Sequence, residues 1–497
     1  GRYNRFMANI EELRETRIKK LNLLKGAGMD PYPARITRDM SLSELRAEFE
    51  SLESDKKPLT IAGRIMAIRG QGAILFIVLD DGTDRFQSVF KKDTIDEKLF
   101  ALFTDAIDIG DFISVTGELF TTDRGEKSVL ATSWSIVTKS LLPLPEKWHG
   151  ITDDDERYRK RYLDLLMNPE LREIFRKRSQ FWNVIREYLL SKNFIEVETP
   201  VLENTTGGAD ARPFITHHNA LDIQMYLRIS AGELWQKKLL VGGMSRVFEI
   251  GRIFRNEGMS AEHLQDYTQL EYYMAYSDYK EGMEMTKELY RLITEKVFGT
   301  TIFTIKEFSI DFAKEWEVYD FVEIIKKEYG VDVLDENIDA LLEQIVDALK
   351  KHKITCDAKN ISVERGADLL WKKVRKTIAG PGFLINVPVY LEPLAKKNPN
   401  NPKTVERFQV ILAGSEMGKG FSELNDPTDQ KERFMKQQAL RDAGDDEAQM
   451  ADMEFVEALE HGMPPAFGFG LSERLFSFLM DKSVRETQLF PLMRPKE

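Results

Sequence analysis

The residues most suited to chemistry lie in the segment 246–276, RVFEIGRIFRNEGMSAEHLQDYTQLEYYMAY. It reads as two strands joined by the loop RNEGMS. Four polar residues alternate along one face of the second strand: Tyr267, Gln269, Glu271 and Tyr273. Such a face needs partners or a cavity, because burying unpaired polar groups costs free energy. Arg255 and Glu257 stand at the mouth of the loop and can reach the same cavity, although one Arg–Glu motif alone more often belongs to a structural ion-pair network.

The polar strand needs neighbours that hold it in place. Beyond residue 160 the sequence predicts a helix at 171–192 and strands at 194–200, 224–229, 246–254, 265–276, 382–389, 407–414 and 465–470. Turns join many of these neighbours, which favours an antiparallel sheet. Residues 308–380 are predicted to be a largely helical insertion, because charged amphipathic patterns dominate there.

A different pattern precedes this region. Five β-rich runs are predicted at 59–68, 73–79, 85–90, 111–119 and 128–137, with a helix at 94–102 between the third and the fourth. This order is typical of an oligonucleotide-binding barrel, and another small β-barrel is the alternative. Helices are predicted at 10–26 and 41–52, and the proline-rich stretch LLPLPEKWHG (141–150) is predicted to be a linker.

Composition limits the class of protein. A chain of 497 residues is too long for one core, and its single cysteine, Cys356, rules out an internal disulfide or a cysteine-based zinc site. No apolar run is long enough to span a bilayer, and no secretory signal segment is recognisable, so we expect a cytoplasmic protein without a membrane partner. The first six residues, before Met7, are interpreted as a tag remnant. A net charge of −12 alone argues against a nucleic-acid partner, but basic clusters occur at 157–162 and 176–178.

Several motifs together resemble a known family. FRNE followed by HLQDYTQLE is similar to motif 2 of the class II aminoacyl-tRNA synthetases, FIEVETPVL to motif 1 and GFGLSERLFSFLMD to motif 3. GGADARPFITHHNALD, GFSELND, DAGDDEA and ALEHGMPP resemble the bacterial-type lysyl-tRNA synthetases. The similarity runs from about residue 7 to the end of the chain.

The resemblance implies an α+β protein: an N-terminal OB-fold barrel followed by a catalytic domain on an antiparallel sheet flanked by helices. The expected boundaries are 1–57 for the tag remnant and N-terminal helices, 58–147 for the anticodon-binding barrel, 148–160 for a linker and 161–497 for the catalytic domain. It also implies ATP, L-lysine and tRNA(Lys) as partners, Mg²⁺ as cofactor and a homodimer formed through motif 1.

The expected chemistry fits these residue types. Amino-acid activation is attack by an already ionised carboxylate on the α-phosphate of ATP, so it requires positioning and charge stabilisation but no protein base. The resemblance implies Arg255 and Arg474 as catalytic residues. The residues implied for ATP are Arg255, Glu257, His263, Tyr267, Glu416 and Arg474. Those implied for the metal are Gln409 and Glu416.

Lysine and anticodon sites follow in the same way. The implied lysine-binding residues are Gly208, Glu233, Arg255, Glu271, Tyr273, Lys419, Phe421 and Glu423. Among them Glu233 and Glu423 should pair with the ε-ammonium, because a buried cation needs anionic partners. The implied anticodon-binding residues are Arg69, Phe76, Gln87 and Glu126, although the continuously apolar run around Phe76 alone favours barrel core.

Some positions depart from the family. Gln409 replaces an expected glutamate, which puts the number of metal ions in question. Lys419 replaces an expected asparagine. It either attracts the substrate carboxylate or neutralises a nearby glutamate. One extra residue precedes Glu233, and Ser472 stands near a usual glycine. Three alternatives remain open: lysine ligation to a protein, an aspartyl or asparaginyl synthetase, and a non-catalytic RNA-binding paralogue.

Overall fold

The structure is a computed structural model that describes residues 2–70, 72–145, 153–258, 260, 263–356, 361–445 and 447–496. These residues form two compact units, one ending at Met167 and the other beginning at Asn168. The short helices α5 (Asp154–Arg159) and α6 (Arg161–Met167) fall in the first unit. Residues 146–152 of the predicted linker lie outside the described residues. In the part of the chain that is described, no helix is long and apolar enough to cross a membrane.

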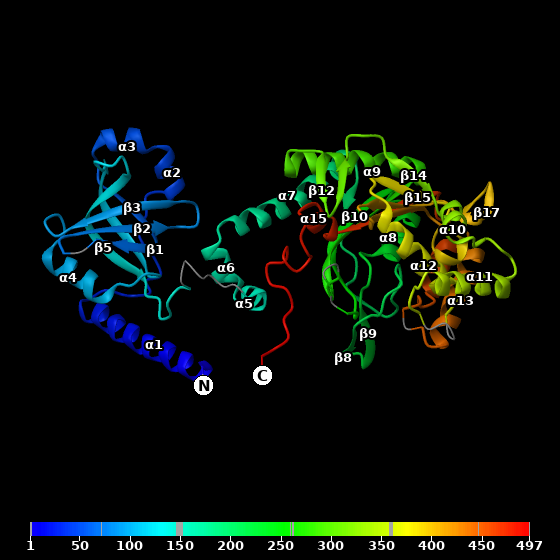
Figure 1. Ribbon diagram of the computed structural model, residues 1–497, viewed down its shortest axis with the longest axis horizontal. Coiled ribbons are helices and arrows are strands. Elements are labelled where there is room, and N and C mark those ends of the chain that lie inside the picture. The colour runs from blue at the N-terminus through cyan, green and yellow to red at the C-terminus, as the bar shows by residue number, and fades with distance from the viewer. Residues whose placement is uncertain are drawn as a thin grey trace. The chain divides into compact units, whose positions relative to one another are not determined.

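The first unit contains a closed five-stranded barrel in the order β1-β2-β3-β5-β4 (Figure 1). Its strands are β1 (Leu59–Arg69), β2 (Ile74–Asp80), β3 (Arg85–Lys91), β4 (Phe112–Thr121) and β5 (Lys127–Thr138), and α4 (Glu97–Ala106) lies between the third and the fourth. In β2 the side chains of Leu75, Ile77 and Leu79 point into the barrel core, as a period of two residues requires. The predicted order of elements is confirmed.

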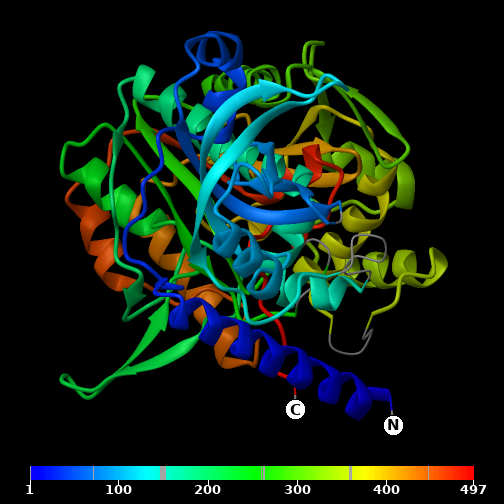
Figure 2. The same cartoon turned by 90° about the vertical axis from the view of Figure 1, so that its left-hand side faces the viewer.

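Three helices precede the barrel. They are α1 (Arg2–Gly26), α2 (Leu42–Ala47) and α3 (Phe49–Asp55). The single helix predicted at 41–52 is therefore wrong, because the chain breaks at Glu48. Ser41 caps α2 in a capping box with Glu44. Figure 2 shows α1, in dark blue, as a long straight helix.

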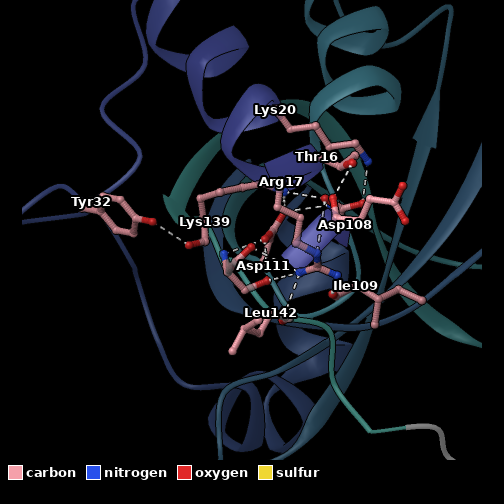
Figure 3. A network of polar contacts seen from close by, with 11 residues as sticks. Thr16, Arg17, Lys20, Tyr32, Asp108, Ile109, Asp111, Lys139 and Leu142 are labelled. Atoms are coloured by element: carbon pink, nitrogen blue, oxygen red, sulfur yellow. Dashed lines mark hydrogen bonds and ion pairs between the residues drawn. The ribbon is translucent and has the colours of Figure 1, made fainter. Parts of the chain in front are cut away.

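A buried polar network joins α1 to one end of the barrel (Figure 3). Lys139 Nζ, which is fully buried, lies 2.7 Å from a carboxylate oxygen of both Asp108 and Asp111. Arg17 donates to the carbonyl oxygens of Ile109, Ser140 and Leu142. These bonds satisfy backbone groups that the end of a barrel leaves without ladder partners.

Replacing Lys139 by methionine is expected to destabilise the protein by about 3–5 kcal/mol, because Asp111 would remain buried without its cation. Lys20→Met is the matched control, since Lys20 also bonds Asp108 at 2.6 Å but is partly exposed. Chemical denaturation monitored in the barrel checks this. Equal losses for both variants would contradict the role given to Lys139.

The second unit is built on an eight-stranded sheet in the order β14-β15-β18-β19-β20-β11-β10-β6. The strands are β6 (Ile195–Glu196), β10 (Arg246–Phe254), β11 (Asp266–Ala275), β14 (Glu317–Asp320), β15 (Gly382–Ile385), β18 (Arg407–Leu412), β19 (Ser415–Ser422) and β20 (Ala466–Ser472). Only the outer pairings β14–β15 and β10–β6 are parallel. The predicted antiparallel sheet is confirmed. β19 was not predicted, because its sequence SEMGKGFS lacks a strand pattern; its pairing with β18 and β20 makes it extended.

Helices cover this sheet, and small hairpins surround it (Figure 1). The helices are α7 (Glu170–Ser191), α8 (Glu233–Val241), α9 (Tyr279–Ile293) with a π-helical turn Thr294–Phe298, α10 (Phe321–Tyr329), α11 (Ile338–Lys351), α12 (Val363–Val374), α13 (Pro427–Asp442), α14 (Met453–Glu460) and α15 (Arg474–Leu479). The 3₁₀ turns are Arg375–Thr377 and Val389–Leu391. The minor strands are β7 (Leu202–Glu203), β8 (Ile215–His218), β9 (Ile223–Leu227), β12 (Ile302–Ile305), β13 (Phe308–Asp311), β16 (Lys397–Asn398) and β17 (Asn401–Val405).

The predicted insertion needs correction. Its first residues are strands: β13 pairs with β12 in a hairpin, and β14 forms one edge of the main sheet. Helical structure begins only at Phe321, where Asp320 caps α10. Helices α10–α12 then bury Ile325, Ile345 and Leu370 in the same core as the sheet residues Leu384 and Ile411. This segment is therefore part of the core of the second unit.

Candidate active site

A polar cavity of about 380 Å³ opens over the middle of the sheet. The polar face of β11 forms its floor, as the alternation in the sequence predicted. All eight predicted lysine-binding residues line it, together with Tyr267 and Glu416 of the predicted ATP-binding set: Gly208, Glu233, Arg255, Glu271, Tyr273, Lys419, Phe421 and Glu423. The sheet thus brings together residues that lie more than 200 positions apart in the chain.

Glu271 is held rigidly in this floor. Its Oε1 accepts hydrogen bonds from the backbone N–H of Ala231 at 2.9 Å and from Gln269 Nε2 at 2.7 Å, while Oε2 accepts from the Tyr273 hydroxyl at 2.9 Å. Burial and the neighbouring Glu233 raise the pKa of its carboxyl. The hydroxyl of Tyr273, a predicted lysine-binding residue, is therefore directed to Glu271.

Glu233 and Glu423 meet at one end of the cavity. Glu233 begins α8, and Glu423 directly follows β19. Lys237, which the sequence analysis did not identify, lies between them. Its Nζ lies 2.8 Å from Glu233 Oε1 and 2.5 Å from Glu423 Oε2. The signal available was the spacing of four residues between Glu233 and Lys237, which places both on one face of a helix.

Two glycines allow the cavity walls to approach each other. Gly208 has φ +87°, and a Cβ there would lie 2.8 Å from the Cβ of Glu233. At Gly468 on β20 a Cβ would lie 2.1 Å from Glu423 Oε1 and within 2.4 Å of the Tyr273 ring. Any side chain at these positions would displace the carboxylates.

A second, larger cavity of about 690 Å³ shares Arg255, Arg407 and Glu416 with the first. The predicted ATP-binding residues Glu257, His263 and Arg474 line it. Arg255 is thus the predicted catalytic residue that faces both spaces. Its guanidinium donates to the carbonyl of Ile229 at 3.3 Å.

The other predicted ATP contacts surround this arginine. The ring of Tyr267 lies 5.8 Å from the Arg255 guanidinium carbon, and burial raises the pKa of its hydroxyl. Arg474 is the first residue of α15 and donates to the Glu416 carbonyl at 3.4 Å. Glu257 and His263 are exposed, and His263 Nδ1 lies 2.9 Å from Ser260 Oγ.

The predicted metal pair is engaged by other groups. Gln409 Oε1 accepts from the guanidinium of Arg407 at 2.6 Å, so a cationic side chain already engages this oxygen. Glu416 Oε1 accepts from the indole N–H of Trp371 at 2.7 Å, and Arg375 lies 3.8 Å from its other oxygen. Among the described residues no group of three or more histidine, cysteine or acidic side chains could hold a metal. The pair therefore does not fit a two-ligand metal site, and cationic side chains occupy that place.

Lys419 neutralises another glutamate of the first cavity, Glu392, and not Glu233, Glu271 or Glu423. Its Nζ lies 3.2 Å from Glu392 Oε1, and Arg407 Nε lies 2.9 Å from Glu392 Oε2. Burial raises the pKa of the Glu392 carboxyl, and the two cations lower it by more. Of the two roles that the sequence left open for Lys419, the structure shows the second, on a different carboxylate.

The barrel places the predicted anticodon residues on one outer face. Arg69 on β1 lies directly opposite Phe76 on β2, and Gln87 on β3 lies opposite Val78, two residues further along the same face. Phe76 is only half buried, so the alternative of a core residue is wrong. Gln87 donates to Ser128 Oγ at 2.9 Å, and Ser128 Oγ donates to the carbonyl of the exposed Glu126.

Comparison with known proteins agrees with both units. Residues 153–494 match the family model described as tRNA synthetases class II (D, K and N), and residues 59–137 match the OB-fold nucleic acid binding domain. The chain is 42% identical to a lysine–tRNA ligase of Thermosipho africanus and 44% identical to those of Thermoanaerobacter sp. and Carboxydothermus hydrogenoformans. These alignments cover 98% of this chain and 97–99% of the relatives.

Proposed function

The chain belongs to the class II lysine–tRNA ligases, and from that membership we propose that it activates L-lysine with ATP and transfers it to tRNA(Lys). In the first step the lysine carboxylate oxygen attacks the α-phosphorus, lysyl-adenylate forms and pyrophosphate leaves. In the second step a hydroxyl of the terminal ribose of the tRNA attacks the acyl carbon, and AMP leaves.

The observation that carries this proposal is the set of three buried carboxylates beside Arg255. Glu233, Glu271 and Glu423 line one cavity, and each is less than a tenth exposed. A cationic amino acid is attracted to this set, and an acidic one is repelled. Arg255 stands where this cavity meets the second one, and so orients the amino-acid carboxylate toward the α-phosphate.

Catalysis then rests on orientation and charge. Arg255 bridges the lysine carboxylate and the α-phosphate, and Arg474 meets the far phosphates together with His263. Tyr267 and Glu257 hold the adenine. Because the nucleophile is already ionised, fixed positive charge near the phosphates is the main requirement. The lining of the second cavity supports the roles of Arg255, Glu257, His263 and Arg474, and Tyr267 lines the first cavity beside Arg255.

We propose Mg²⁺ as the companion of ATP, as is usual for this family. Of the two predicted metal ligands only Glu416 offers a carboxylate to the ATP cavity. The guanidinium of Arg375, beside Glu416, supplies positive charge in the same place.

The barrel is proposed to read the anticodon. Phe76→Ala is expected to raise KM for tRNA(Lys) by about tenfold, because stacking of a base on an aromatic ring contributes roughly 1–3 kcal/mol. Lysine-dependent pyrophosphate exchange should not change. Aminoacylation at varied tRNA concentration tests this, with Ile109→Ala, an exposed apolar residue of the same unit, as the control. Unchanged tRNA kinetics in Phe76→Ala would remove the anticodon assignment.

A cytoplasmic homodimer through motif 1 is part of the proposal. Around that motif four large apolar side chains are 40–53% exposed: Leu190, Ile195, Val201 and Leu202. A second copy of the chain would cover them. Sedimentation of the purified protein gives the oligomeric state.

Pyrophosphate exchange with each amino acid in turn is the experiment that tests the function. Exchange that depends on lysine alone, followed by transfer to tRNA(Lys), supports the proposal. Exchange with aspartate or asparagine, lysine transfer to a protein only, or no exchange at all would identify one of the alternatives. The full-length similarity to lysine–tRNA ligases does not favour those alternatives.

A further inference from the structure

Lys237 is a fully buried cation at the end of the amino-acid cavity. Its side chain is 1% exposed and contacts both Glu233 and Glu423. Three aromatic rings surround its ammonium nitrogen, at 5.4 Å (Phe421), 5.8 Å (Tyr273) and 5.9 Å (Phe455). Two carboxylates and an aromatic enclosure form the kind of environment that a protein offers to an ammonium ligand.

Lys237 does not occupy the place of the substrate. Glu233, Phe421 and Glu423 line the cavity, whereas Lys237 is not among the described residues that do so. Lys237 therefore lies behind the carboxylates, on the side of α8 and Phe455. The carboxylates have one side toward this ammonium and the other toward the cavity.

The position of this cation matters because three carboxylates are buried close together. Burial and like-charge repulsion favour a proton on such a group. The pKa of the Glu423 carboxyl is raised overall, because burial and the neighbouring Glu233 raise it by more than Lys237 lowers it. For Lys237 itself, burial lowers the pKa of the ammonium, but Glu233 and Glu423 raise it by more, so the ammonium stays charged.

We propose that Lys237 is a fixed counter-ion of Glu233 and Glu423 that favours the ionised form of Glu423 in the empty site and sets the charge that the pocket presents to its substrate. This rests on the proposed function. In their ionised forms Glu233, Glu271 and Glu423 together with Lys237 carry two net negative charges, which match the α- and ε-ammonium groups of lysine. The substrate carboxylate is matched separately by Arg255.

The sign of the pH effect follows from the groups that face Lys237. These are Glu233 on α8, Glu423 after β19, and Glu271 and Tyr273 on β11, with Glu392 further away. Removing the Lys237 ammonium lets the pKa of the Glu423 carboxyl rise further. The binding of lysine needs ionised carboxylates. When the pH is lowered, a variant without the Lys237 ammonium should therefore lose lysine binding at a higher pH than the wild-type protein.

The test measures L-lysine affinity by calorimetry between pH 6 and 9 in Lys237→Met and in the control Lys238→Met. Lys238 is the next residue of the same helix and lies 4.0 Å from the exposed Glu454. At pH 7 the Lys237 variant should bind lysine about tenfold more weakly than the wild-type protein. The pH below which lysine affinity falls should be about one pH unit higher in this variant. ATP affinity should not change. If lysine affinity falls at the same pH in both variants as in the wild-type protein, the proposal is wrong.

A double variant keeps the test decisive if Lys237→Met does not fold. Lys237→Met/Glu423→Gln removes both charges of one buried pair and restores two net negative charges. It should bind lysine more tightly than Glu423→Gln alone, whose pocket has one. Weaker binding by the double variant would overturn the proposal. Failure of the proposed function looks different, because then the wild-type protein itself would not bind lysine.

Discussion

Arg255→Ala is expected to lower the rate of lysine-dependent pyrophosphate exchange by about a thousandfold, at the upper end of the loss for one preorganised charge-stabilising donor. Arg255 is the predicted catalytic residue that lines both the first cavity, proposed for lysine, and the second cavity, proposed for ATP. Without it the lysine carboxylate and the α-phosphate, both negative, would approach each other without a shared counter-charge. Steady-state exchange at saturating lysine and ATP measures the effect.

Arg252→Ala is the matched control for this experiment. Arg252 lies on β10, three residues before Arg255, but its side chain is 42% exposed and pairs with Asp266. Its loss should change exchange less than about threefold, as for an exposed ion pair of little net energy. Similar losses in the two variants would show that the effect arises from general disturbance of β10.

The second large effect is expected for Glu423→Gln, which should raise KM for lysine by about a hundredfold and leave KM for ATP unchanged. Removing one partner of a buried charge pair costs roughly 2–5 kcal/mol. The Glu423 carboxylate is fully buried. It lines the first cavity, proposed for lysine, but not the second cavity, proposed for ATP. Exchange kinetics at varied lysine and then at varied ATP separate the two constants.

Glu457→Gln is a suitable control, because Glu457 is exposed on α14 near the same region. Equal KM values for lysine in the wild-type and Glu423→Gln proteins would exclude this carboxylate from the site. A rise in KM for ATP alone would show that Glu423 acts on ATP binding and not on lysine binding.

Strong periodicity made part of the fold predictable. The strand predicted at 246–254 has the bounds of β10, and the one at 265–276 differs from β11 by one residue at each end. Barrel strands with alternating apolar residues were found in the same way. Elements that depend on distant pairing were not: β19 is glycine-bearing and has no pattern of its own, and β14 becomes a strand only because β15 lies beside it.

The candidate site was predictable to a similar extent. Residue types and the resemblance indicated the carboxylates and Arg255, and the cavity lining includes them. Partners that come from other elements could not be predicted. Trp371 and Arg375 reach Glu416 from the end of α12 and the turn after it, and Lys237 reaches Glu423 across the core. Such contacts depend on packing between segments, which the local sequence does not encode.

Calorimetric titration of the whole protein with L-lysine and with L-norleucine tests the central claim most directly. Norleucine has the same main chain and a side chain of similar shape, but it lacks the ε-ammonium. If buried carboxylates select the substrate, lysine should bind at least about a hundredfold more tightly, because the site would otherwise leave its charges unpaired. Affinities for lysine and norleucine within threefold of each other would contradict the account.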